Sequence, residues 1–254
     1  MDTNLERQIT AASRSVEEAR RLAYHDSSRL GVLVEQISVL ADLRQKEGDF
    51  RKAESLFREA LFRTQELRKP DPELVIGIYS LLAHLYDRWG RPADAAAYYE
   101  KAIKIANDRG VGGDKVAVIK NNLGMIFKQA RDFDRAQRFY EEALEYFRQA
   151  EGDMGARVAS VLNNLGVLYY TRLDVERAQT LHEEALNIRA HLRQDQFDPA
   201  DLSQTYFNLG AVYKAAGDFE KAESCVERAR SIRAGMNGSR PKPRRVASLL
   251  IDRT

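Results

Sequence analysis

Asparagine recurs at a regular interval in the second half of the chain, at Asn122, Asn164 and Asn208. These positions lie 42 and 44 residues apart, and two of them directly follow another asparagine, Asn121 or Asn163. An amide side chain has both donors and acceptors, so it can bind the C=O and N–H groups of an extended peptide without requiring a particular peptide sequence. The alternative is that each amide caps or bridges neighbouring helices. The doubled asparagines favour a ligand, because an unpartnered amide inside a core costs about 1–3 kcal/mol.

Residues for catalysis or metal binding do not form a recognisable constellation. His182-Glu183-Glu184 begins like a zinc-protease helix, but Leu186 stands where that motif has its second histidine. The glycine-rich segment Gly110–Lys115 has neither phosphate-loop spacing and follows no strand, so we interpret it as a flexible connection. The acidic pair Glu141-Glu142 has basic neighbours, which indicates a solvated surface. We therefore expect a protein that is not an enzyme and that carries no cofactor or metal.

Composition and charge narrow the class of protein further. The 254 residues include 40 Lys+Arg, 38 Asp+Glu and a single cysteine, Cys225, for a net charge of +2. Residues 237–254 carry +4 of this charge and residues 1–236 carry −2, so the body of the chain does not predict a nucleic-acid surface. One cysteine cannot form an internal disulfide, which indicates a reducing compartment. No segment approaches the roughly 20 apolar residues of a membrane span. The predicted location is cytoplasmic, without membrane insertion.

Five segments of the chain align without gaps and predict a repeated helical hairpin. Each begins with a leucine followed by a small residue, and the leucines are 42, 41, 42 and 44 residues apart. Each segment then carries two alanines seven residues apart, which lie on one face of a helix, with a bulky residue four positions after the first. Small residues beside bulky ones are what close helix packing requires. The leucines are Leu40, Leu82, Leu123, Leu165 and Leu209; the small residues Ala41, Ala83, Gly124, Gly166 and Gly210; the bulky residues Phe57, Tyr99, Tyr140, His182 and Val226.

These residues resemble the tetratricopeptide repeat (TPR), whose unit carries L-G-x₂-Y followed by A-x₃-F. Leu165-Gly166 with Tyr169 matches the first half of the motif, and Ala136 with Tyr140 matches the second. The spacing of about 42 residues is similar to that of kinesin light chain-type TPRs. The resemblance implies an all-α fold, a right-handed α-solenoid of five helix–turn–helix repeats, in which the first helix of each repeat lines a concave groove.

The aligned segments also predict how the chain is divided. Residues 1–27 are expected to form a capping helix, because Ala12 and Ala19 repeat the alanine pair of the later units. Residues 28–236 are expected to form the five repeats, with the last helix ending near Ala234. Residues 237–254 are expected to form a basic, flexible tail, whose apolar part Val246–Ile251 would be a cap, a groove ligand or disordered. Asp71 and Asp198 are predicted to cap helices that begin with proline.

The candidate groove is the side of the first helices that packing does not use. In the third unit Ile119, Leu123, Ile126, Phe127 and Ala130 follow a core-facing pattern, which leaves the asparagines on the opposite side. The first two units have Val39 and Leu81 in place of the repeating asparagine, so binding is expected in units three to five. The predicted peptide-binding residues are Asn121, Asn122, Met125, Lys128, Asn163, Asn164, Val167, Tyr170, Phe207, Asn208 and Lys214.

These observations favour a protein-interaction scaffold or adaptor that binds an extended peptide of a partner protein in this groove. Two other functions remain open at this stage. One is a regulatory sensor of a signalling peptide, and the other is a structural protein that self-associates through its ends or its tail. A further possibility is that the tail segment Val246–Ile251 occupies the groove of its own chain.

Overall fold

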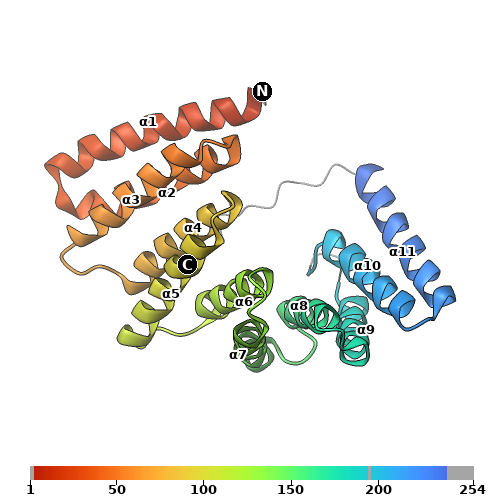
Figure 1. Cartoon of the computed structure of the whole chain (residues 1–254). Coiled ribbons are helices and arrows are strands. Elements are labelled where there is room, and N and C mark those ends of the chain that lie inside the picture. The colour runs from red at the N-terminus through yellow and green to blue at the C-terminus, as the bar shows by residue number, and fades with distance from the viewer. Residues whose placement is uncertain (1–2, 194–195, 239–254) are drawn as a thin grey trace. The chain divides into compact units, whose positions relative to one another are not determined.

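The chain is helical throughout the part that the computed structural model describes, residues 3–193 and 196–238. These residues form eleven α-helices and one short 3₁₀ turn, η1 (Ser27–Arg29), and contain no strand (Figure 1). Consecutive helices are joined by short connections. The helices are α1 (Thr3–His25), α2 (Leu30–Glu47), α3 (Phe50–Gln65), α4 (Pro72–Arg88), α5 (Pro92–Arg109), α6 (Asp114–Gln129), α7 (Phe133–Glu151), α8 (Ala156–Thr171), α9 (Val175–His191), α10 (Pro199–Ala215) and α11 (Phe219–Gly238).

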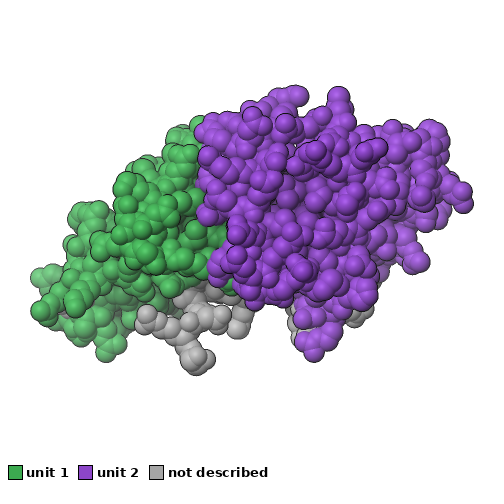
Figure 2. Space-filling view, turned by 90° about the horizontal axis from the view of Figure 1, so that it is seen from below, with its two compact units in different colours: residues 1–119, 246–254 green, residues 120–245 purple. Residues whose placement is uncertain are grey.

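The described residues divide into two compact units, residues 3–119 and residues 120–238 (Figure 2). The first unit contains α1 to α5, in which each helix packs against the next along the chain. The second contains most of α6 and all of α7 to α11, and from α7 onward consecutive helices again pack together. The predicted groove residues all belong to the second unit.

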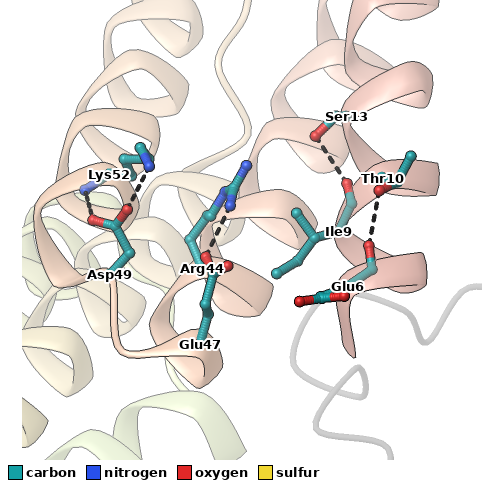
Figure 3. A network of polar contacts seen from close by, with 8 residues as sticks. All are labelled: Glu6, Ile9, Thr10, Ser13, Arg44, Glu47, Asp49 and Lys52. Carbon is teal, nitrogen blue, oxygen red and sulfur yellow. Dashed lines mark hydrogen bonds and ion pairs between the residues drawn. The ribbon is translucent and has the colours of Figure 1, made fainter. Parts of the chain in front are cut away.

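Aspartates in the connections between helices determine where several helices begin. Asp49 accepts a hydrogen bond from the backbone N–H of Lys52, at 3.1 Å, and the Lys52 ammonium pairs with the same carboxylate (Figure 3). These bonds lower the pKa of Asp49 and satisfy a helix-end N–H group that has no partner within the helix. Asp71 and Asp198 accept from the backbone N–H groups of Glu73 and Ala200, so both predicted caps are confirmed.

The helix α1 packs against α2 through one apolar stripe, formed by Ile9, Ala12, Val16 and Ala19, all of them buried. Its polar side carries local hydrogen bonds such as that from Thr10 Oγ1 to the carbonyl of Glu6 (Figure 3). Arg20 also donates to Glu59 of α3, at 2.7 Å. The stripe covers an apolar face of the first hairpin, which is what an end of a repeat array requires.

In the third, fourth and fifth hairpins a glycine on the first helix lies against a ring or aliphatic group on the second. Gly124 of α6 lies against the Tyr140 ring, and a Cβ added at this glycine would be 2.6 Å from the ring carbons. Gly166 of α8 lies against His182 in the same way, at 2.7 Å. The predicted pairing of small and bulky residues is therefore confirmed at these two hairpins.

Two details differ from the sequence-based expectation. Ala130 was predicted to face the core, but it follows the last residue of α6 and is exposed in the turn. The last helix continues past Ala234 to Gly238, because Gly235 is accommodated within the helix. The predicted tail residues 239–254 lie outside the described residues.

Replacing Gly166 with alanine tests the packing of the fourth hairpin. We expect Gly166→Ala to lower the free energy of unfolding by about 1–3 kcal/mol, because the added methyl group displaces the buried His182 ring. Gly31→Ala is the matched control, since a Cβ at this helical glycine meets nothing within 4 Å. Urea denaturation followed by circular dichroism measures both variants. Equal stability of the two variants would contradict this packing argument.

Candidate functional site

The candidate site lies on α6, α8 and α10, the first helices of the third, fourth and fifth hairpins. Each of the asparagines predicted for the groove is half-buried, between the core face of its helix and the surface. The leucine that follows each repeating asparagine is buried, at Leu123, Leu165 and Leu209. This buried anchor determines the direction in which the adjacent amide points.

The asparagines form bridges between successive first helices. Asn164 Nδ2 of α8 donates to Asn121 Oδ1 of α6, at 2.9 Å. Asn208 Nδ2 of α10 donates to Asn163 Oδ1 of α8, at 3.1 Å. The alternative role that the sequence left open, bridging neighbouring helices, is thus present. Because the doubled asparagines supply one partner to the preceding helix and one to the following helix, they join α6, α8 and α10 into one polar row.

This row keeps hydrogen-bonding capacity beyond the bridges. Each amide has two N–H donors and an oxygen with two lone pairs, and each bridge uses one donor and one acceptor site. In the described structure the Asn163 amide N–H groups and the Asn164 Oδ1 oxygen make no hydrogen bond to protein. Asn208 Oδ1 accepts from Gln204 Nε2, and Asn122 is also partnered. The bridges therefore fix the amides in place and leave donors and acceptors available to a ligand.

Apolar side chains lie on the same helices as the polar row. Met125 of α6 and Val167 of α8 are half-buried. Tyr170 and Phe207 are exposed to 36% and 49%. The set offers apolar contacts beside the amides.

Lys128 is the charged residue of the set with the clearest electrostatic signal. It is half-buried on α6, and in the part of the chain that the structure describes it forms no ion pair. Burial lowers the pKa of its ammonium group, because water that would stabilise the charge is excluded. Lys120 on the same helix differs, since it pairs with Glu142 at 2.8 Å. Lys214 of α10 is exposed.

The corresponding face of the first unit has a different chemistry. Val39 is 46% exposed and Leu81 is half-buried, so no amide stands at the repeating position in α2 or α4. Gln45 Nε2 instead contacts His84 Nδ1 at 2.9 Å. Burial and Arg88 lower the pKa of His84. The first two hairpins therefore lack the repeating asparagine in the sequence, and their first helices also lack its amide on the surface.

A buried basic pair behind the row was only partly visible in the sequence. His182 of α9 is fully buried, and neither of its ring nitrogens has a hydrogen-bond partner. Arg189 on the same helix is 3% exposed and donates to the hydroxyls of Thr205 and Ser160. Burial lowers the pKa of Arg189. The sequence contains a signal for Arg189. The first three units have Thr64, Ala106 and Phe147 at the position equivalent to Arg189, and an arginine departs from that pattern.

No helix in residues 3–193 and 196–238 combines the length and the apolar character needed to span a membrane. Within the same residues, no three His, Cys, Asp or Glu side chains are grouped so that they could hold a metal ion.

The fold and the repeated contacts define a protein of helical repeats, and comparison with known proteins identifies the family. Sequence profiles of the tetratricopeptide repeat match residues 35–108, 115–191 and 203–234. The chain belongs to the tetratricopeptide-repeat family, whose members are generally protein-interaction scaffolds and typically not enzymes. The predicted all-α repeat fold is confirmed.

Among solved structures, BtubC (BKLC) from P. vanneervenii is 71% identical, with all of both chains covered and a TM-score of 0.85. A Podosopora anserina kinesin light chain structure, whose TPR-like repeats are nearly identical to one another, is 18% identical to this chain. The match covers 82% of this chain and 97% of that chain, with a TM-score of 0.64. A Rap protein complexed with competence and sporulation factor is also 18% identical, with 88% and 65% covered and a TM-score of 0.66. At 18% identity these two share only the fold. No curated protein matches the chain significantly.

The buried His182 predicts a measurable pH dependence. Burial, and secondarily Arg189, lower the pKa of His182 from 6.5 to about 4 in the folded protein. Between these pH values the unfolded chain binds a proton that the folded chain does not, so acidification through this window lowers the free energy of unfolding, by up to about 3 kcal/mol. His182→Phe removes this contribution, and Phe57 occupies the equivalent position in the first hairpin. We expect the stability of the variant to fall less steeply from pH 6.5 to pH 4. Parallel stability profiles of the two proteins would contradict the expectation.

Proposed function

We propose that the chain is a non-enzymatic scaffold that binds an extended, acidic peptide segment of a partner protein along α6, α8 and α10. The observation that carries the proposal is the row of bridged asparagines next to Lys128. The amides offer donors and acceptors to a peptide backbone, and the Lys128 ammonium group, which has no ion-pair partner among the described residues, offers a counter-ion to an aspartate or glutamate side chain.

The bridges support this function because they reduce the entropic cost of binding. A free asparagine on a helix surface would lose rotamer freedom when it bound a peptide, and that loss opposes binding. Asn121, Asn163, Asn164 and Asn208 are already held by one another. A peptide that meets this row finds its partners in position.

The identity of 71% to BtubC over the whole length supports a shared mode of binding in the two proteins. We further propose that both proteins act through the same face, and that the chain works in the cytoplasm. BtubC therefore provides an independent molecule in which the variants described below can be repeated.

Substitution of the amides tests the groove. The variant carries Asn122→Ala, Asn164→Ala and Asn208→Ala together, and it is immobilised and exposed to a cell extract. We expect it to retain about tenfold less partner protein than the unchanged chain, because several hydrogen bonds of about 1 kcal/mol each are lost. Retained proteins are identified and quantified by mass spectrometry. Thermal unfolding of the variant is recorded as well, since loss of the bridges also lowers its stability. If the folded variant retains as much partner protein as the unchanged chain, the proposed peptide-binding groove is wrong.

Substitution of Lys128 tests the acidic character of the partner and avoids the bridges. Lys128→Met is expected to weaken retention of the same partner by about tenfold, as loss of one charge-assisted contact does, and to remove most of its salt dependence. Lys120→Met is the matched control, because this lysine of α6 is already paired with Glu142. Equal effects of the two substitutions would show that Lys128 has no special role.

A further inference from the structure

The outer side of the last hairpin presents an apolar pocket of about 450 Å³ between α10 and α11. Phe207 and Phe219 are both largely exposed there, at 49% and 68%. A face of this kind at the end of a repeat array is normally covered, because contact with the next repeat buries the apolar surface. The lining residues include Phe207, Ala211, Phe219, Ala222, Val226 and Glu227.

The equivalent face of the fourth hairpin shows what fits there. It is covered by the first helix of the next unit: α10 packs on α9, and Leu186 of α9 contacts the cluster around Leu209. At the edge of this contact the Tyr213 hydroxyl donates to Glu183, at 2.7 Å. The residue 44 positions after Glu183 is Glu227, which lines the pocket. The pocket is thus the counterpart of a surface that receives an amphipathic first helix.

The sequence beyond α11 continues the spacing of the repeats. Pro72 and Pro199 open α4 and α10, and each stands ten residues before the leading leucine of its unit. Pro243 stands 44 residues after Pro199, the spacing that separates Leu165 from Leu209. Proline is favoured at the first position of a helix, because its missing N–H has no partner there in any case.

The residues after Pro243 also match a first helix. Residues 245–250 read RVASLL, and residues 157–162 at the start of α8 read RVASVL, so five of the six are identical and lie 88 residues apart, two units of 44. Within residues 157–162 the four buried positions, Val158, Ala159, Val161 and Leu162, correspond to Val246, Ala247, Leu249 and Leu250. All four are apolar. The match ends at Arg253, which replaces the leading leucine.

The connection has a suitable length. Four residues separate Gly238 at the end of α11 from Pro243, and four residues also separate α5 from α6 and α7 from α8. We propose that residues 243–254 form the first helix of a sixth unit and cover the pocket between α10 and α11. Because Phe207 and Lys214 line this pocket and also belong to the candidate groove, the cap determines where the groove ends.

Hydrogen–deuterium exchange of the full chain tests the cap. The amides of residues 246–251 are expected to exchange at least about tenfold more slowly than in a synthetic peptide of residues 239–254, because a docked helix protects its backbone. Leu249→Asn, at a position buried in α4, α6, α8 and α10, should abolish this protection and speed exchange in α11. Ser248→Asn is the matched control, since among its equivalents Glu35 and Gln204 are exposed and only Gly77 is buried, and it should leave the protection unchanged.

Three results would contradict the proposal that residues 243–254 cover the pocket. The first is exchange of residues 246–251 as fast as in the free peptide. The second is protection that survives Leu249→Asn and is lost in Asn164→Ala, which would assign the segment to the groove. The third is protection that increases with protein concentration, which would assign it to a second copy of the chain.

Discussion

The second unit depends on one steric constraint, the contact between a glycine on the first helix of a hairpin and a bulky group on the second. At Gly124 and Gly166 the ring of Tyr140 or His182 occupies the space that a Cβ would need. This contact brings the two helices of a hairpin close together, and the buried leucine next to the glycine then faces the core. The amide on the other side of that leucine is therefore carried to the surface in every unit that has one. The position of the candidate site follows from the packing of the core.

Within the second unit this constraint is repeated on helices of similar length, which is why the asparagines of α6, α8 and α10 come into contact. The two amide bridges exist because the doubled asparagines stand at matching positions on successive first helices. The bridges have both a structural and a functional consequence. They stabilise the alignment of the helices, and they hold in place the groups that we propose bind a peptide backbone. Lys128 adds to this row a charge that forms no ion pair within the described residues.

Much of the fold was predictable from the sequence, because the fold depends on local spacing. The leucines, the small residues, the alanine pairs and the capping aspartates all recur at intervals that can be read directly, and the structure places Asp71 and Asp198 as helix caps. The contacts of the site were not predictable to the same degree. Sequence spacing placed the asparagines on one face, but it could not decide between ligand binding and bridging, since that depends on distances between separate helices. The buried Arg189 was missed for a related reason, because its partners Ser160 and Thr205 come from two other helices.

The most direct test is a two-dimensional ¹H–¹⁵N NMR titration of the chain with its captured partner peptide, followed through the side-chain amide groups. The proposal predicts that binding shifts the NH₂ resonances of Asn122, Asn163, Asn164 and Asn208, together with backbone resonances of α6, α8 and α10. Shifts confined to the second helices α7, α9 and α11, with the asparagine side chains unchanged, would contradict it.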